Sequence, residues 1–217
     1  MKNKKAIVLM WVIALLPAVL VFLAMPHLPE RVPIHWGLSG EADGWGSPAT
    51  LWLLAAAGPF MAALFQFLPR LDPKRENYGK FQGLYDLFGV LMPTLELVMM
   101  CLTLSEALQP GKLPIGKAIT ILVGLLLMAV GNMMGKLKPN WFMGIRTPWT
   151  LSDPDVWNRT HRLGGWVFFL SGMAAVILAL LAPMEVCFTM FMILILGGAA
   201  LTYIMSWKWY KDKHRED

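Results

Sequence analysis

Six long apolar runs, separated by polar segments, dominate the pattern of this chain. They cover about residues 6–25, 49–68, 87–105, 118–135, 163–184 and 186–207. Each run is close to the ~20 residues that a helix needs to cross about 30 Å of hydrocarbon. The strict alternation of apolar and polar positions that marks membrane barrel strands is absent. The pattern therefore predicts an all-α integral membrane protein, a bundle of six transmembrane helices forming one polytopic domain over residues 1–217.

Composition and charge support lipid as the solvent of this chain. Hydrophobic residues make up 57% and charged residues 15%, against roughly 45–50% and about 25% in soluble proteins. Of the 19 Lys and Arg residues, only Arg31, Lys112 and Lys117 fall outside if the N-terminus is inside. Because cytoplasmic segments carry the excess of basic residues, we expect both termini in the cytoplasm. Attraction to anionic lipid then accounts for the basic charge, without direct nucleic acid binding.

Two polar residues lie within the apolar runs. Glu96 falls near the middle of the third run, where a charged side chain costs about 2.5–3.5 kcal/mol. We therefore expect it to face the bundle interior, either as a protonated packing residue or as a proton or cation relay. Asn132 lies nearer the cytoplasmic end of the fourth run, and we expect it to form hydrogen bonds between helices.

The connection after the first run, residues 26–48, is predicted to be an ordered outer loop. Alternation of Val32, Ile34 and Trp36 with polar residues indicates a short extended segment, and glycines follow it where tight turns are expected. Two interpretations stay open, a cap over the outer end of the bundle and a ligand-binding loop. The candidate ligand-binding side chains are those of His35, Trp36, Glu41 and Asp43.

The connection after the fourth run, residues 136–162, is predicted to be an ordered cytoplasmic loop. Ser152, with Asp155 three residues later and Pro154 between them, signals the start of a helix that continues into the fifth span. On that helix Trp157 and His161 share a face. The loop is interpreted either as a polar lid that pins the fourth and fifth helices or as a docking face for a partner. Arg146 is expected to bond to the carboxylate of Asp153 or Asp155.

Motifs of common catalytic centres are absent. The chain has no P-loop, no Gly-x-Ser-x-Gly, no His-Glu-x-x-His and no Cys-x-x-Cys. Its four histidines fall on both sides of the predicted bilayer, so they cannot share one zinc ion. The sequence therefore predicts a protein that is not an enzyme and has neither a cofactor nor a metal site.

Both loops resemble a known family. Residues 144–157, Gly-Ile-Arg-Thr-Pro-Trp-Thr-Leu-Ser-Asp-Pro-Asp-Val-Trp, with Asn158 and His161 following, resemble the signature of the SdpI family of bacterial membrane proteins. Residues 28–36 and 40–44 resemble the domain of uncharacterised function that commonly precedes it. The resemblance implies a cytoplasmic element made of Arg146, Thr147, Pro148, Trp149, Thr150, Asp153, Trp157 and Asn158. It implies an outer element made of His35, Gly40, Asp43 and Gly44.

The resemblance also implies a function. It points to an immunity and signal-transduction protein of the bacterial cytoplasmic membrane, which confers resistance to a secreted toxin peptide outside and holds a soluble regulator inside. Two alternatives stay open. One is a transporter or channel for a small solute, an ion or a proton that uses Glu96. The other is a metal-dependent membrane enzyme that uses His35 with Glu41 and Asp43, or His161 with Asp153 and Asp155.

Overall fold

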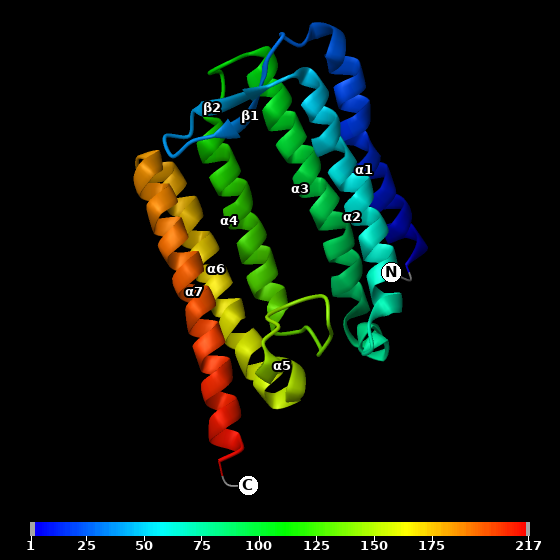
Figure 1. Ribbon diagram of the computed structural model, residues 1–217, viewed down its shortest axis with the longest axis vertical. Coiled ribbons are helices and arrows are strands. Elements are labelled where there is room, and N and C mark those ends of the chain that lie inside the picture. Colours follow the sequence, from blue (N-terminus) through cyan, green and yellow to red (C-terminus); the bar gives the residue numbers. More distant parts are fainter. Residues whose placement is uncertain (1–2, 216–217) are drawn as a thin grey trace. The chain divides into compact units, whose positions relative to one another are not determined.

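The computed structural model describes residues 3–215, so Lys2, one of the predicted cytoplasmic charges, lies outside the described residues. The elements in chain order are α1 (Lys4–Ala24), η1 (Met25–His27), β1 (Val32–Trp36), β2 (Ala42–Gly46), η2 (Pro48–Thr50), α2 (Leu51–Leu71), η3 (Arg75–Phe81), α3 (Gln82–Leu108), α4 (Ile115–Met134), α5 (Pro148–Ser152), α6 (Pro154–Leu181) and α7 (Met184–Lys213). In the described residues six helical stretches, around α1, α2, α3, α4, α6 and α7, are long and apolar enough to cross a membrane. The predicted fold class is confirmed, with a small β-hairpin after the first long helix (Figure 1).

A local signal accounts for the start of α1, and three of the long helices contain proline. The side chain of Asn3 caps α1 by accepting a hydrogen bond from the Lys5 amide at 3.0 Å, which satisfies a backbone donor at the helix end. Pro17, Pro59 and Pro93 lie inside α1, α2 and α3. Proline is tolerated in membrane helices because neighbouring groups and local adjustments satisfy the freed carbonyls.

The first compact unit comprises the described chain up to Arg70 together with Gln82–Ile119. Here α1, α2 and α3 lie side by side (Figure 1), and one apolar cluster joins all three to the hairpin. The cluster contains the buried residues Val21, Val32, Leu51, Ala55, Met100, Leu104 and Ala107. Val32 of β1 therefore fixes the base of the hairpin against the helices.

The second compact unit comprises Leu71–Phe81 and the described chain from Thr120 onward. Glycines bring α4 and α6 into backbone contact here. A Cβ on Gly131 would lie 2.6 Å from the Gly165 carbonyl oxygen, and one on Gly124 would lie 2.8 Å from the Gly172 carbonyl oxygen. Small residues of this kind let membrane helices approach closely. The organisation of the whole chain as one polytopic domain stays a prediction.

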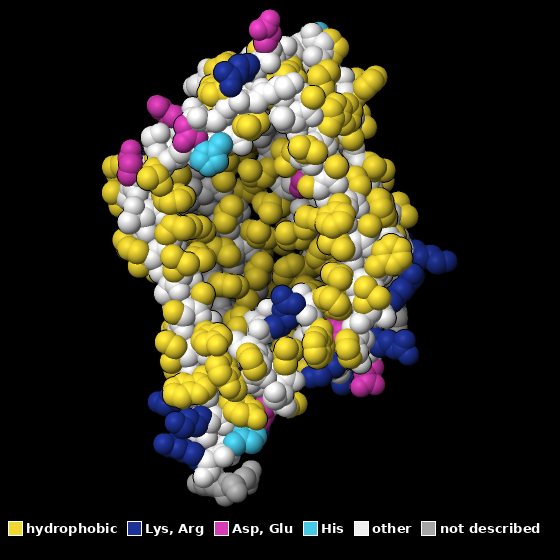
Figure 2. Space-filling model, in the orientation of Figure 1, with side chains coloured by type: hydrophobic (Ala, Val, Ile, Leu, Met, Phe, Trp, Pro, Cys, Tyr) yellow, Lys and Arg dark blue, Asp and Glu magenta, His cyan; other side chains and the backbone are white. Residues whose placement is uncertain are grey.

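Many large apolar side chains of the long helices are exposed. Leu181 is 82% exposed, Leu53 77% and Phe22 69%, and hydrophobic side chains cover much of the helical surface in Figure 2. Exposed apolar area on this scale is unusual for a soluble protein, in which such patches are small. Lipid is the solvent that fits it, so the chain is a multi-pass membrane protein.

Candidate functional site

The predicted cytoplasmic loop folds around a buried asparagine. Asn140 is fully buried, and its Oδ1 accepts hydrogen bonds from the amides of Phe142 at 2.9 Å and Met143 at 2.6 Å. Its Nδ2 donates to the carbonyl oxygens of Lys138 at 2.9 Å and Met143 at 3.1 Å. All the polar atoms of the side chain are thus used to shape the turn, as expected of a buried amide.

Beyond this turn, Gly144 brings the backbone against His161 of α6. Gly144 has a φ of +99°, and a Cβ there would lie 2.2 Å from His161 Nε2. The Ile145 amide donates to that Nε2 at 3.0 Å, while Nδ1 donates to the Trp157 carbonyl oxygen at 2.8 Å. Since one nitrogen accepts and the other donates, these partners select the neutral tautomer with the proton on Nδ1.

Trp157 completes this buried pair. Its indole stacks on His161 with ring centroids 3.9 Å apart, and its Nε1 donates to the Leu137 carbonyl oxygen at 3.0 Å. Both side chains are fully buried. Every polar atom of the pair is bonded, so Trp157 and His161 hold the loop on α6 and offer no surface to a partner.

The short helix α5 is fixed by two threonines. Thr147 and Thr150 form a capping box: the Thr150 amide donates to Thr147 Oγ1 at 3.1 Å, and the Thr147 amide donates to Thr150 Oγ1 at 2.8 Å. Thr150 Oγ1 also donates to the Ile145 carbonyl oxygen at 2.9 Å. Thr147 Oγ1 is 3.1 Å from Ser206 Oγ of α7. The buried threonines thus bond α5 to the preceding loop and to α7.

Asp153 begins α6 and ties it to the end of α7. Its Oδ1 accepts from the amides of Asp155 at 2.7 Å and Val156 at 3.2 Å, and Lys213 Nζ lies 2.8 Å from Oδ2. Although burial raises the pKa of this carboxyl group, the hydrogen bond from Lys213, the two backbone amides and the lysine charge outweigh it and lower the pKa below its usual value. The expected helix start is confirmed, but the cap is Asp153 instead of Ser152, whose hydroxyl donates to the Pro148 carbonyl oxygen.

The segment Leu71–Phe81 holds the loop from its other side. Asp72 Oδ2 accepts from the Trp141 amide at 2.9 Å and from the Tyr78 hydroxyl at 2.8 Å. Lys74 Nζ donates to the Leu151 carbonyl oxygen at 3.0 Å, and Asn77 Nδ2 donates to the Pro139 carbonyl oxygen at 2.9 Å. Two sequence-distant segments therefore form one ordered surface.

Only some side chains of the predicted cytoplasmic element are accessible to a partner. Arg146, Pro148 and Asn158 are exposed, and Trp149 is half-buried with its ring edge-on to Tyr203 of α7 at 5.1 Å. Arg146 does not reach an aspartate as expected; its Nη1 donates to the Trp141 carbonyl oxygen at 2.7 Å. Asp153 pairs instead with Lys213, and Asp155 pairs with Arg159 at 3.1 Å.

The predicted outer loop contains an antiparallel hairpin of β1 and β2. His35 Nδ1 lies 2.5 Å from Asp43 Oδ1 across the two strands, and both side chains are exposed. A Cβ on Gly44 would lie 2.8 Å from His35 Cβ, and one on Gly37 would lie 2.6 Å from Asp43 Oδ2. Glycines on both sides thus leave room for the His–Asp pair at the surface.

The tip of the hairpin lies against the start of α4. Gly40 has a φ of +81°, and a Cβ on Gly116 would lie 2.4 Å from Gly40 Cα. The Gly37 amide donates to the Glu41 carbonyl oxygen at 2.9 Å, and the Glu41 side chain is exposed. Trp36 is half-buried, and its buried Nε1 has no hydrogen-bond partner in the described part of the chain.

The two intramembrane polar residues have different environments. Glu96 is buried, and neither carboxylate oxygen has a hydrogen-bond partner among residues 3–215. It lies beside Gly58 of α2, where a Cβ would be 2.8 Å from both Glu96 Oε2 and the Ala14 carbonyl oxygen of α1. Asn132 is exposed on α4 and lines a pocket, so its role in bonding helices together stays a prediction.

In the described residues no group of three His, Cys, Asp or Glu side chains is placed to hold a metal ion. His35 has Asp43 as its carboxylate neighbour, and His161 has both ring nitrogens committed to backbone groups.

The sequence did not identify several residues that bond to the predicted cytoplasmic loop. Asn140, Asp72, Lys74 and Lys213 all bond to the loop. Asn140 lies four residues before the first residue of the motif, so its position was a usable signal for a turn residue. The other three are distant in sequence, and only the fold brings them to the loop.

Comparisons with known proteins give matches to two regions of the chain, and each region contains one of the two loops. Residues 136–206 match the SdpI/YfhL protein family, and residues 12–58 match a domain of unknown function, DUF1648. The chain is 24% identical to the immunity protein SdpI of Bacillus subtilis (strain 168) over 185 residues, which cover 85% of this chain and 86% of that protein. No solved structure gives a significant match. The family resemblance expected from the two loops is confirmed.

Proposed function

Because the chain is an SdpI/YfhL-family protein with a DUF1648 region before the family region, we propose that it is a non-enzymatic immunity protein of the bacterial cytoplasmic membrane. It would protect the cell against a secreted peptide toxin. The observation that carries the proposal is the extent of the similarity to an immunity protein, which spans 85% of the chain.

The charge distribution supports an orientation with both termini in the cytoplasm. The loop with Asn140 and His161 then faces the cytoplasm, and the hairpin faces outward. Lys208, Lys211 and Lys213 near the end of α7 add basic charge to the inner side. In this orientation the toxin meets the hairpin. The exposed side chains of Arg146 and Pro148 and the half-buried Trp149 face the cytosol, where they would contact a soluble regulator.

The outer part of the proposal is that the hairpin binds the toxin. His35 and Asp43 form an exposed polar pair on a rigid strand pair, and Trp36 beside them has an indole N–H without a partner in the described chain. Exposed polar and aromatic groups held on a rigid scaffold are typical of peptide recognition surfaces. We propose this face as the place where a toxin peptide binds.

Survival of a toxin-sensitive bacterium tests the immunity role. Cells that express the wild-type chain should survive a peptide toxin that kills cells with empty vector. His35→Ala should reduce protection about tenfold, the effect of losing roughly 1.4 kcal/mol of binding. His27→Ala is the matched control, because His27 is exposed in η1 before the same hairpin and lies outside β1 and β2.

Two further variants separate the inner from the outer role. Trp149→Ala should leave toxin survival intact but reduce recovery of a soluble regulator with the membrane fraction. Trp207→Ala, which changes an exposed tryptophan of α7, should alter neither survival nor recovery. Variant levels in the membrane are measured in each case. Equal killing with and without wild-type protein across a panel of peptide toxins would overturn the immunity role.

A second candidate function rests on Glu96. A buried carboxyl group without a hydrogen-bond partner is costly, and intramembrane ionisable residues commonly serve in ion or proton movement. Under this alternative the chain is a transporter or channel. Proteoliposomes with a proton gradient test it: wild type should dissipate the gradient faster than Glu96→Gln at equal protein content, and equal rates would contradict transport through Glu96.

A further inference from the structure

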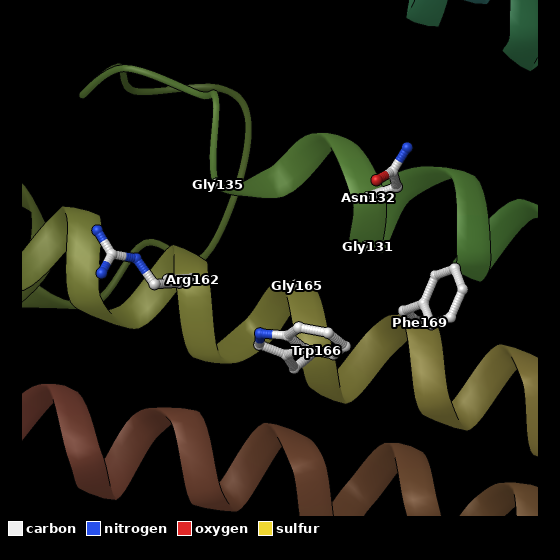
Figure 3. Close-up of a pocket in the computed structure, with 7 residues that line it drawn as sticks. All are labelled: Gly131, Asn132, Gly135, Arg162, Gly165, Trp166 and Phe169. Carbon is white, nitrogen blue, oxygen red and sulfur yellow. The ribbon is translucent and has the colours of Figure 1, made fainter.

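A pocket lies between α4 and α6 within the second unit. Its volume is about 320 Å³, and Figure 3 shows the side chains of Asn132, Arg162, Trp166 and Phe169 around it. Asn132 comes from α4, and the other three come from successive turns of α6. Trp166 is 64% exposed, so the pocket is a groove open to the surroundings of the helices.

Glycines form the floor of this groove. A Cβ on Gly131 would lie 2.6 Å from the Gly165 carbonyl oxygen, and one on Gly165 would lie 2.8 Å from the Gly131 carbonyl oxygen. The two backbones therefore touch, and the larger side chains stand on either side. Gly135 continues the lining at the end of α4, and a Cβ there would meet nothing within 4 Å.

The groove changes from cationic to apolar along α6. Arg162 lies near the predicted end of the bilayer, and Phe169 lies seven residues further on, about 10 Å deeper at 1.5 Å per residue. Asn132 lies between these levels, since its neighbour Gly131 contacts Gly165 and Phe169. In Figure 3 the Trp166 ring lies between Arg162 and Asn132, and the Phe169 ring lies beyond Asn132. A positive charge at the interface, an indole ring and an amide below it and an apolar ring deepest match the order of groups in a phospholipid.

Arg162 and Arg159, one turn apart on α6, differ in their carboxylate partners. Arg159 forms an ion pair with Asp155, with 3.1 Å between Nε and Oδ2. Among residues 3–215 no carboxylate lies within ion-pair distance of Arg162. An arginine at a membrane interface offers a planar set of donors that suits phosphate oxygens, so the end of the groove selects a phosphate group.

We propose that this groove binds an anionic phospholipid from the inner leaflet. Arg162 contacts the phosphate, the Asn132 amide donates to an ester oxygen of the glycerol backbone beside Trp166, and an acyl chain lies along Phe169. Charge complementarity selects this occupant, because the basic side of the protein faces the anionic leaflet and basic pockets between membrane helices bind such headgroups. Bound lipid then joins α4 to α6 and stabilises the second unit.

Native mass spectrometry of the purified full chain in neutral detergent tests this site. The probes are phosphatidylglycerol and phosphatidylcholine with the same acyl chains, and inorganic phosphate. Wild type should bind phosphatidylglycerol more tightly than phosphatidylcholine. Arg162→Gln should weaken phosphatidylglycerol binding about fivefold, which corresponds to the roughly 1 kcal/mol of one basic residue near an anionic surface. Arg159→Gln removes the same charge one turn away and should not change it.

A second variant blocks the groove without altering charge. Gly135→Leu places a side chain in open space, at a residue whose φ is not left-handed, so the protein should fold and lose lipid binding. Equal effects of Arg162→Gln and Arg159→Gln, or equal binding of the two lipids by wild type, would overturn the site. Binding of inorganic phosphate that depends on Arg162, with no preference for the lipid, would show an anion site only and would also overturn it.

Discussion

The imidazole ring of His161 lies nearly flat on the indole ring of Trp157, with centroids 3.9 Å apart and planes 19° from parallel. His161 also accepts a hydrogen bond from the Ile145 amide, and Trp157 donates one to the Leu137 carbonyl oxygen. A similar pair recurs at the end of α7, where the C-cap residue His214 stacks on Tyr210 at 4.2 Å and its Nδ1 donates to the Tyr210 carbonyl oxygen at 2.9 Å. The first pair is buried and the second contains an exposed histidine, which allows a controlled comparison.

His161→Ala should destabilise the protein strongly. It removes two hydrogen bonds and a stacked ring from a fully buried position, and together these changes should lower the free energy of unfolding by about 2–4 kcal/mol. His214→Ala, at the exposed position, should cost less than about 1 kcal/mol. Thermal unfolding in detergent measures both. Equal losses from the two variants would mean that the buried bonds do not hold the loop.

Gly144→Ala should be more harmful than a change at another left-handed glycine. The new Cβ would lie 2.2 Å from His161 Nε2, and the backbone φ of +99° adds strain. Gly111 has a φ of +72° but open space around its Cβ position, so Gly111→Ala should cost only about 1 kcal/mol. Unfolding midpoints of the two variants, compared with wild type, separate steric clash from backbone strain. Similar midpoints would contradict the close contact.

The ion pair of Asp153 and Lys213 should make stability depend on pH. Because the pKa of Asp153 is lowered in the folded protein, its contribution is present above the unfolded pKa and is lost as pH falls through the folded pKa. Asp153→Asn preserves helix capping but removes the charge. At neutral pH it should cost about 1 kcal/mol, a modest value because Lys213 is half-exposed. The difference from wild type should vanish in strong acid; a difference that persists there would assign the loss to capping.

Glu96→Met should stabilise the fold while removing any function of the carboxyl group. The buried oxygens have no hydrogen-bond partner in the described chain, and removing such a group relieves a cost of about 1–3 kcal/mol. Asp86 is the control on the same helix, since its Oδ1 accepts a hydrogen bond from Gln82 at 2.8 Å. Asp86→Leu should therefore not stabilise. Destabilisation by Glu96→Met, measured by thermal unfolding, would indicate that Glu96 has a bonded partner.

Sequence reasoning located the long helices well because apolar runs of membrane length have few alternatives. It also located the loop that matches the SdpI/YfhL family, since the motif is long and local. It placed the α6 cap at Ser152, one residue early, because Ser and Asp are both good caps and the choice depends on the turn before them. It missed the partner of Asp153 because Lys213 is sixty residues away and reaches it only after α6 and α7 pack together.

The same sixty-residue separation sets an order of events during synthesis. The ribosome makes Asp153 long before it makes Lys213, and the whole of α6 and α7 must be translated and inserted in between. A nascent chain paused before α7 therefore displays the loop without its lysine and without the Ser206 contact to Thr147. The contacts that complete this loop therefore form only after the last long helix has been made.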